Sequence, residues 1–261
     1  MSASISSIRV NILGVGISAI DMEDAVATID RWIDQRQRQF VCITGVHGVM
    51  ECRRDIELRG ILRAAGLVTP DGMPLVWMAH RLGFDRVRRV YGPDLMREVS
   101  WLSQERGYRH FYFGGGPGLA DALAAQQRAA YPGIQVVGTL SPPFRPASEA
   151  EDEAMVQAIN AAKPDIVWVG LSTPKQERWM SAHRDRIEAP VMIGVGAAFD
   201  FLAGTKRQAP LWMQRSGLEW AFRLASEPRR LWRRYATIVP SFLVLAGAQL
   251  AHRRGAVRIR G

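Results

Sequence analysis

Gly66-Leu-Val-Thr-Pro-Asp-Gly-Met-Pro-Leu-Val-Trp77 is the stretch of sequence that decides the fold of this chain. An apolar run ends at Thr69, a Pro-Asp-Gly turn follows, and Pro74 opens a second apolar segment, which is typical of a strand, a tight turn and a helix. We therefore expect Asp71 at the carboxyl end of a strand, the edge at which open parallel sheets bind ligands. Taken alone, these residues fit a plain Asp-Gly turn better than a functional carboxylate.

Outside this stretch, short apolar runs alternate with segments whose apolar residues recur at helical spacing. Further strands are expected at residues 8–15, 40–44, 89–92, 109–113, 134–140, 165–171 and 191–196. Helices are expected at residues 25–33, 47–64, 93–106, 149–162 and 174–187, with others after Pro74 and up to Ala130. Because continuously apolar strands are buried on both faces, this alternation predicts a mostly parallel, Rossmann-like α/β sheet with helices on both sides.

The end of the chain differs from the rest in composition. We expect an α/β catalytic core, residues 1–205, and a C-terminal helical appendage, residues 206–261. Within the appendage, residues 211–234 are rich in Arg and Trp and residues 235–251 are apolar. The apolar run is shorter than the roughly 20 residues that span a bilayer, and Pro240 and Gln249 interrupt it. Its basic flanks favour a helix that lies on the membrane, and a helix buried against the core or a subunit partner is the alternative.

The chain of 261 residues carries a formal net charge of +9, which suits an anionic partner such as a nucleic acid, a phosphorylated metabolite or an acidic membrane. Much of this charge lies beside apolar residues near the C-terminus, at Arg229, Arg230, Arg233, Arg234, Arg253, Arg254, Arg258 and Arg260. That position favours a membrane surface, because a nucleic-acid site would interleave basic residues with exposed aromatic ones. A nucleic-acid-binding protein is the alternative from another class of function.

Cysteine use and the N-terminal residues indicate the compartment. Cys42 and Cys52 match neither a disulfide framework nor a zinc-binding spacing, so both are expected to be buried thiols of a reducing compartment. Residues 1–9 lack the positive region and apolar run of a signal peptide. We therefore expect a cytoplasmic protein that associates peripherally with the inner face of the cell membrane.

Two glycine-rich segments, residues 114–118 and 194–199, each join an expected strand to a helix, as phosphate-binding loops do. Neither matches the dinucleotide fingerprint, because its third glycine would fall on Leu119 and on Phe199. A plain tight turn explains each segment equally well. A dinucleotide-dependent oxidoreductase is thereby disfavoured, and we expect no cofactor.

The segment Leu171–Glu177 begins a helix by local rules, with Thr173 as N-cap, Pro174 at the first position and Gln176 at the third, as in a capping box. A second interpretation follows from its place after the most apolar strand, on the sheet edge expected for Asp71. There Gln176 would offer its amide to a ligand instead of capping the helix.

The sequence shows no metal-ligand pattern. No pair of aspartates at i and i+2 ends a strand, and the five histidines are scattered, so a metal centre is not expected. If a diphosphate leaves in the reaction, arginines must supply the positive charge that stabilises it, as bidentate donors can. Arg223, Arg230 and Arg233 have helical spacings of 7 and 3, which would let one helix present them on one face. For these three residues alone, a solvated basic face is the simpler interpretation.

A family resemblance is carried by Thr69-Pro-Asp-Gly-Met73, Arg89-Val-Tyr-Gly-Pro-Asp94, Phe113-Gly-Gly-Gly116, Val169-Gly-Leu-Ser-Thr-Pro-Lys-Gln-Glu-Arg-Trp179, Gly194-Val-Gly-Ala-Ala-Phe-Asp-Phe-Leu-Ala-Gly204, Glu219-Trp220 and Glu227-Pro-Arg-Arg-Leu-Trp-Arg-Arg-Tyr235. In this order, over residues 8–235, these stretches resemble the WecG/TagA/CpsF glycosyltransferases, glycosyltransferase family 26. The resemblance implies an inverting, metal-independent enzyme that moves a sugar from a UDP-sugar to a polyprenyl-diphosphate-linked sugar at the cytoplasmic membrane. It also implies a place in bacterial surface or exopolysaccharide synthesis.

The resemblance implies roles for particular residues as well. Asp71 matches the family's proposed general base, Thr44 and Gln176 match pocket residues, and Arg89 matches an arginine near the donor. The C-terminal arginines thought to close over the diphosphate are matched by Arg223, Arg230 and Arg233.

At one position the chain departs from the family pattern. Two residues after Thr44, where family members commonly carry Asn, this chain has Val46, which removes an amide that would contact donor or acceptor. We therefore expect a plain hexose such as glucose as the transferred sugar, with an N-acetylmannosamine-type sugar or its uronic acid as the alternative. The oligomeric state is left open, a homo-oligomer included.

Overall fold

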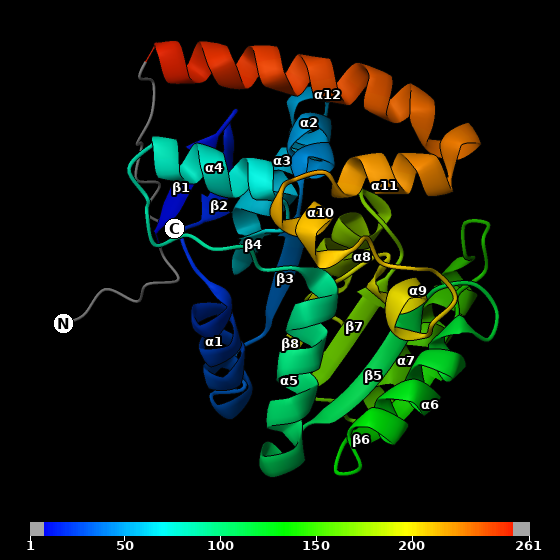
Figure 1. The fold of residues 1–261 in the computed structure, drawn as a ribbon. Coiled ribbons are helices and arrows are strands. Elements are labelled where there is room, and N and C mark those ends of the chain that lie inside the picture. Colours follow the sequence, from blue (N-terminus) through cyan, green and yellow to red (C-terminus); the bar gives the residue numbers. More distant parts are fainter. Residues whose placement is uncertain (1–7, 253–261) are drawn as a thin grey trace. The chain divides into compact units, whose positions relative to one another are not determined.

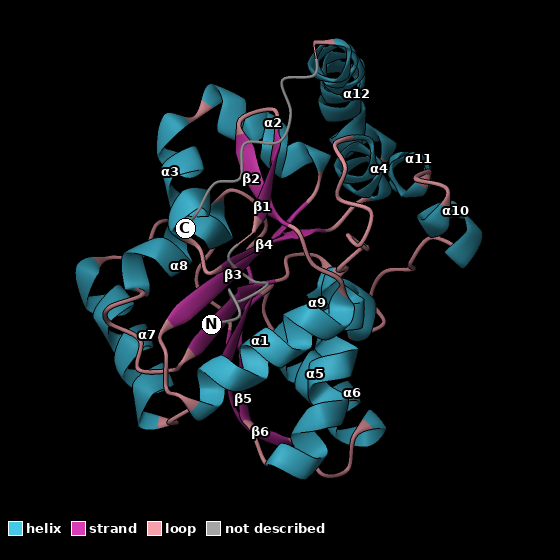
Figure 2. Ribbon diagram, turned by 90° about the vertical axis from the view of Figure 1, so that its left-hand side faces the viewer, coloured by secondary structure: helices cyan, strands magenta, loops and turns pink. Residues whose placement is uncertain are grey.

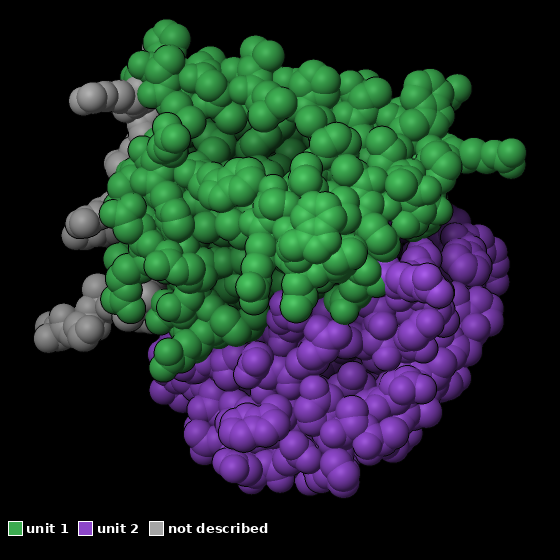
Figure 3. All heavy atoms as spheres, in the orientation of Figure 1, with its two compact units in different colours: residues 1–25, 44–91, 208–261 green, residues 26–43, 92–207 purple. Residues whose placement is uncertain are grey.

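A computed structural model describes residues 8–252 of the chain (Figure 1). These residues form two compact units (Figure 3): unit 1 comprises residues 8–25, 44–91 and 208–252, and unit 2 comprises residues 26–43 and 92–207. The N-terminal residues 1–7 and the basic residues Arg253, Arg254, Arg258 and Arg260 lie outside the described residues.

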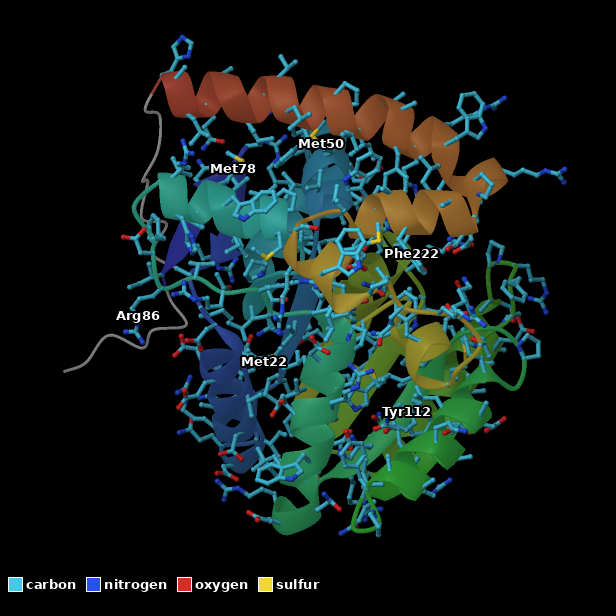
Figure 4. All side chains as sticks on the ribbon, in the orientation of Figure 1. Met22, Met50, Met78, Arg86, Tyr112 and Phe222 are labelled. Carbon is cyan, nitrogen blue, oxygen red and sulfur yellow. The ribbon has the colours of Figure 1, made fainter. Side chains whose placement is uncertain are left out.

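Unit 2 is built on parallel strands. In order across the sheet these are β3 (Gln39–Thr44, whose last residue belongs to unit 1), β8 (Val191–Gly194), β7 (Ile166–Gly170), β5 (Arg109–Gly114) and β6 (Gln135–Leu140). Trp168 on β7 pairs in register with Tyr112 on β5 and with Ile193 on β8. All three side chains are buried (Figure 4 labels Tyr112), because both faces of the sheet are covered, and this explains why the strands are apolar at every position.

Helices cover this sheet on both faces (Figure 2). On one face lie α1 (Met22–Asp34), α5 (Gly92–Arg106) and α6 (Leu119–Ala130), on the other α7 (Glu149–Ala161) and α8 (Lys175–His183), and α9 (Ala198–Leu202) follows β8. The apolar face predicted for α1 is confirmed, since Ala25, Ile29, Trp32 and Ile33 are buried. The predicted fold class, a parallel α/β sheet with helices on both faces, is therefore confirmed.

Unit 1 holds the remaining elements. These are β1 (Arg9–Ile12), β2 (Val15–Ser18), α2 (Val46–Arg54), α3 (Ile56–Ala64), β4 (Leu67–Pro70), α4 (Met73–Arg81), α10 (Leu211–Arg215), α11 (Glu219–Ser226) and α12 (Pro228–Ala251). The single strand predicted over residues 8–15 is wrong, because the structure has an antiparallel hairpin there. Leu13 and Gly14 both take positive φ, 51° and 90°, and so reverse the chain between β1 and β2.

Two further predictions in unit 1 are wrong. The single helix expected over residues 47–64 is split at Asp55, whose carboxylate accepts a hydrogen bond from the Leu58 amide (2.9 Å) and caps α3. The strand expected at residues 89–92 is a loop that runs directly into α5.

The appendage ends in one continuous helix, α12, which lies across α2 (Figure 1). Its buried side chains, Leu231, Ile238, Phe242 and Ala246, follow helical spacing and form one face. Met50 of α2 is buried in the same unit (Figure 4). The helix continues through Pro240, which lies on its exposed side while packing holds the opposite side.

The C-terminal end of α12 is tied to the hairpin at the start of the chain. The side-chain amide of Gln249 donates to the Asn11 carbonyl (2.8 Å), and its oxygen accepts from the Leu13 amide (2.9 Å). Thus α12 packs within unit 1 along its length. None of the helices within residues 8–252 is long and apolar enough to cross a membrane.

Candidate active site

The Asp71 turn has the structure that its sequence predicts. β4 ends at Pro70 and α4 begins at Met73, with Asp71 between the strand and the helix. The Asp71 amide donates to the carbonyl oxygen of Thr44 (3.0 Å), and the Asp71 carbonyl oxygen accepts a hydrogen bond from Nε of Arg89 (2.5 Å). Because both backbone polar groups of Asp71 are bonded, the fold fixes the place from which its carboxylate projects.

The carboxylate of Asp71 lies beside the start of α2. A Cβ atom added at Gly45 would be 3.6 Å from Oδ2 of Asp71, an ordinary van der Waals contact. Thr44 is buried at the end of β3, and Val46 is the first residue of α2. The structure therefore brings three of the predicted site residues, Thr44, Val46 and Asp71, together in unit 1.

Arg89, predicted to lie near the donor, is bonded at both ends of its guanidinium group. Besides Nε, its Nη1 donates to Oε1 of Gln214 (3.1 Å) and its Nη2 donates to Oε2 of Glu219 (2.5 Å). Its Cζ lies 3.9 Å from the centroid of the Tyr91 ring. We call Arg89, Tyr91, Gln214 and Glu219 the Glu219 cluster.

The Tyr91 hydroxyl completes this cluster by donating to Oε1 of Glu219 (3.3 Å). Burial, and then the negative charges of Glu219 and Asp71, raise the pKa of Tyr91 above its usual value, so its hydroxyl keeps the proton that it donates. Sequence reasoning assigns no role to Tyr91, Gln214 or Glu219. Glu219 stands 130 residues after Arg89, a separation that no local spacing rule covers, and its place in a stretch that carries the family resemblance is the signal that marks it.

The three arginines predicted on one helical face lie on two helices. Arg223 is on α11, whereas Arg230 and Arg233 are on α12. The prediction is wrong because Glu227 precedes Pro228, and a residue before proline avoids the helical conformation. Glu227 accordingly has φ −133° and ψ 57°, and the chain changes direction there.

These arginines also differ in what they contact. Arg230 donates through Nε to Oε2 of Glu227 (2.6 Å), and Cζ of Arg233 lies 5.3 Å from the centroid of the Trp232 ring. Both contacts lie within α12 and the residue before it. Neither contact therefore joins Arg230 or Arg233 to another helix or strand.

Arg223 acts on the start of α2 together with Arg234, a residue that the prediction missed. Burial, and then the positive charges of Arg234 and Arg223, lower the pKa of His47 to about 4. His47 is therefore neutral near pH 7 and adds no positive charge to that of the arginines.

Gln176 lies in unit 2 on α8, where it is buried. Its Nε2 donates to Oε1 of Glu177 (3.1 Å), and the same oxygen accepts from the Thr173 hydroxyl (2.8 Å). The predicted capping box is wrong, because Thr173 is bonded to Glu177 and no described side chain caps α8 at its N-cap, Pro174. Burial raises the pKa of Glu177.

The side-chain oxygen of Gln176 is buried and has no hydrogen-bond partner among residues 8–252. The amide group faces two glycines at the end of β8: an added Cβ would lie 3.1 Å from Nε2 of Gln176 at Gly194, the last residue of the strand, and 3.4 Å from Oε1 at Gly196. A buried acceptor left unbonded is costly, so this arrangement suits an amide that accepts a hydrogen bond from a ligand.

The glycine-rich segment at residues 114–118 joins β5 to α6, as predicted. Its Gly115 amide donates to the carbonyl oxygen of Gly170 (3.0 Å), and an added Cβ at Gly114 would be 2.7 Å from the Gly170 backbone. Glycine at position 114 is therefore explained by the close approach of β5 and β7 and by its positive φ of 129°.

The sequence predicts no metal centre and two buried cysteines. In the described part of the chain, residues 8–252, no group of three or more His, Cys, Asp or Glu side chains could hold a metal ion. Cys42 and Cys52 are both buried, as predicted.

The family described as the Glycosyl transferase WecG/TagA/CpsF family matches residues 10–256. This chain belongs to that family. The resemblance identified in the sequence is confirmed, and the protein is a glycosyltransferase.

Similar proteins of Bacillus spizizenii, Bacillus subtilis and Staphylococcus aureus carry the name N-acetylglucosaminyldiphosphoundecaprenol N-acetyl-beta-D-mannosaminyltransferase. The Bacillus spizizenii protein is 26% identical over 227 residues, which are 87% of this chain and 84% of that protein. The Bacillus subtilis protein is 28% identical over 209 residues, 79% of this chain and 78% of its own. The Staphylococcus aureus protein (strain MW2) is 28% identical over 229 residues, which are 86% of this chain and 87% of that protein.

Proposed function

We propose that this glycosyltransferase moves a sugar from a UDP-sugar to a sugar carried on polyprenyl diphosphate, with inversion and without a metal ion. Membership of the family supports the reaction class, and the names of the three relatives describe an acceptor on diphosphoundecaprenol. The observation that carries the proposal is the Asp71 turn, which holds a carboxylate at the end of β4 through two backbone hydrogen bonds.

Asp71 is the proposed general base. Its carboxylate takes the proton of an acceptor hydroxyl while that oxygen bonds to the anomeric carbon of the donor. The bond from that carbon to the diphosphate oxygen breaks, and its electron pair leaves with UDP. General base catalysis of this kind typically contributes about 10²- to 10⁴-fold to the rate. The beta configuration in the relatives' names is the one that inversion of an α-linked UDP-sugar produces.

The residues proposed to contact substrate are Thr44, Val46, Arg89, Gln176, Arg223, Arg230 and Arg233. The buried oxygen of Gln176 suits a hydroxyl or amide hydrogen of a sugar. Guanidinium groups bind phosphate oxygens with two parallel hydrogen bonds, so the C-terminal arginines would stabilise the departing diphosphate. We add Arg234 to them, because its charge acts on His47 together with that of Arg223.

For the donor we propose a plain UDP-hexose such as UDP-glucose, used in surface or exopolysaccharide synthesis. Val46, beside the Asp71 turn, has no amide with which to bond an acetamido group. A second candidate is an N-acetylmannosamine donor, which the names of the three relatives favour. The two candidates differ in whether an N-acetyl group must be recognised near Val46.

We propose that the appendage, residues 206–261, holds the enzyme on the inner face of the membrane. Away from its packed face, α12 exposes Trp232 (52%) among the arginines of its first turns, and Leu243 (64%) and Val244 (72%) farther along the helix. Such a combination binds the boundary between anionic headgroups and acyl chains. Co-sedimentation with anionic vesicles, in place of salt-sensitive RNA binding, is the expected result and separates this proposal from a nucleic-acid-binding protein.

A panel of UDP-sugars tests the reaction. The full chain is incubated with each donor and a lipid-linked N-acetylglucosamine diphosphate acceptor, with and without EDTA. We expect transfer from one donor class with no loss in EDTA. Transfer from UDP-N-acetylmannosamine but not UDP-glucose would select the second candidate, and the absence of transfer from every UDP-sugar would refute the proposal.

A further inference from the structure

Glu219 occupies a position that the proposed chemistry leaves unexplained. It is the first residue of α11, and its side chain is only 19% exposed. Its Oε2 accepts from Arg89 and its Oε1 accepts from the Tyr91 hydroxyl. Because each oxygen of the carboxylate is bonded within unit 1, any contribution of Glu219 to the reaction acts through its neighbours.

The guanidinium group of Arg89 links Glu219 to the Asp71 turn. Its Nε donates to the Asp71 carbonyl, its Nη2 to Glu219, and its Nη1 to Gln214 on α10. A guanidinium group is planar and rigid, so bonds at its two ends fix the distance between the groups they reach. The Arg89 side chain is 15% exposed, which makes this ion pair less screened than a surface pair.

The helix α11 carries this link to a C-terminal arginine. Arg223 lies four residues after Glu219, so both project from the same side of α11. The charge of Arg223 reaches His47 in the first turn of α2. That helix follows Thr44, whose carbonyl oxygen accepts a hydrogen bond from the Asp71 amide, so the start of α2 is tied directly to the Asp71 turn.

We propose that Glu219 is a positioning residue for the Asp71 base. Through Arg89 it holds α11 against the Asp71 turn, so that the Asp71 carboxylate and the Arg223 charge keep a fixed separation. The inference rests on the proposed function, because that function assigns the base to Asp71. Arg89 carries five N–H groups and uses three of them here, so its proposed contact with the donor is compatible with this role.

Unit 2 supplies a matched control, which we call the Asp30 cluster. Nη2 of Arg106 donates to Oδ2 of Asp30 (2.9 Å), the Tyr108 hydroxyl donates to Oδ1, and the Asp30 side chain is also 19% exposed. This cluster joins α1 to the amino end of β5, whereas ligands bind outside the carboxyl ends of parallel strands. A change at Asp30 therefore removes a carboxylate–arginine ion pair, with an arginine that is 47% exposed, without touching the Asp71 turn.

The kinetic test compares Glu219→Ala with Asp30→Ala in the full chain, with the UDP-sugar and lipid-linked acceptor that the wild type uses. We expect Glu219→Ala to lower kcat by about tenfold or more with little change in KM, because a misplaced base weakens transition-state contacts alone. Glu219→Gln, which keeps an acceptor for Arg89, should restore most of kcat, and Asp30→Ala should leave it unchanged.

A double-variant cycle separates positioning from general weakening of the fold. In an Asp71→Asn background, Glu219→Ala should cause no further loss of the residual rate, because residues that act as a unit are not additive. Equal effects of Glu219→Ala and Asp30→Ala on kcat, or a full additional loss in the Asp71→Asn background, would overturn the inference.

Amide hydrogen exchange gives a readout that does not need activity. Glu219→Ala should speed exchange of the Asp71 amide, which is bonded to Thr44 in the wild type, and Asp30→Ala should not. Unchanged exchange at Asp71 in Glu219→Ala would overturn the inference even in an active enzyme. A wild type that transfers no sugar would instead refute the proposed function, so the two failures are distinguishable.

Discussion

The Glu219 cluster of unit 1 and the Asp30 cluster of unit 2 have the same chemistry but different connections. Each consists of a carboxylate that accepts from an arginine and from a tyrosine hydroxyl, and each carboxylate side chain is 19% exposed. In the Glu219 cluster the arginine also donates a hydrogen bond to the Asp71 carbonyl oxygen. In the Asp30 cluster the arginine, Arg106 of α5, bonds Asp30 of α1.

This difference teaches that residue type and burial do not mark a functional cluster by themselves. Arg89 matters because its third bond reaches the residue proposed as base, whereas the bond from Arg106 to Asp30 joins α5 to α1 within unit 2. Paired substitutions, one in each cluster, therefore measure how much the hydrogen bond to Asp71 contributes to kcat.

The largest effect is expected at Asp71 itself. Asp71→Asn keeps the shape and the backbone hydrogen bonds of the turn but removes the base, so kcat should fall by about 10²- to 10⁴-fold. The matched change Asp30→Asn should leave kcat unaltered. Initial rates with the wild-type donor and acceptor measure both variants, and near-normal kcat in Asp71→Asn would remove the reason for assigning a role to the Glu219 cluster.

A smaller effect is expected from the arginines. Arg89→Lys keeps the charge but cannot bond Asp71, Gln214 and Glu219 at once, and we expect a loss of about tenfold in kcat, which corresponds to about 1.4 kcal/mol. Arg106→Lys should change thermal stability slightly and kcat not at all. If both variants lowered kcat to the same degree, the comparison between the clusters would fail.

The tyrosines test the uncharged hydrogen-bond donor of each cluster. Tyr91→Phe removes a long hydrogen bond of 3.3 Å to Glu219, and a bond of this kind contributes about 1 kcal/mol, so kcat should fall only a few-fold. Tyr108→Phe should lower the melting temperature without a change in kcat. Thermal unfolding and initial rates of both variants separate these outcomes, and a loss of kcat in Tyr108→Phe would contradict the account.

The smallest effect is a shift in one histidine pKa. Burial alone lowers the pKa of His110 in unit 2 to about 3, whereas the pKa of His47, about 4, is lowered by burial and then by Arg234 and Arg223. Arg223→Ala should raise the pKa of His47 and leave that of His110 unchanged, because removal of a nearby positive charge favours the protonated form. Titration of the histidine ring signals by NMR measures both, and equal shifts would show that Arg223 does not act locally.

The same two histidines set the direction of an acid effect on stability. Each is neutral in the folded chain at a pH where a histidine of the unfolded chain, with its ordinary pKa of 6.5, takes up a proton. The contribution of these two histidines to the free energy of unfolding should therefore be present above pH 6.5 and be lost as the pH drops from there, down to about 4 for His47 and about 3 for His110. Urea unfolding at a series of pH values measures this slope.

Local sequence pattern was sufficient for the sheet and for the Asp71 turn. Continuous apolar runs predict buried parallel strands, and Pro70-Asp-Gly72 predicts the change from strand to helix, because these signals depend on neighbours in the chain. The hairpin at Leu13 and Gly14 was missed because its strands together look like one apolar run.

The Glu219 cluster and the C-terminal arginines could not be predicted in the same way. The bond from Arg89 to Glu219 spans 130 residues, so it depends on the tertiary fold and not on neighbours in the chain. The bend at Glu227 then decides which arginines act on His47, so Arg234 joins Arg223 there. Near Gln176 the capping rule fails for a local reason, since the buried Glu177, four residues after Thr173, accepts from the hydroxyl that would have capped α8.

The anomeric configuration of the product tests the central claim most directly. The full chain is supplied with an α-linked UDP-sugar and the lipid-linked acceptor in the presence of EDTA, and the new linkage is assigned by NMR. A single displacement assisted by Asp71 predicts a β linkage and undiminished transfer in EDTA. An α linkage, or transfer that requires a divalent metal, would contradict the account.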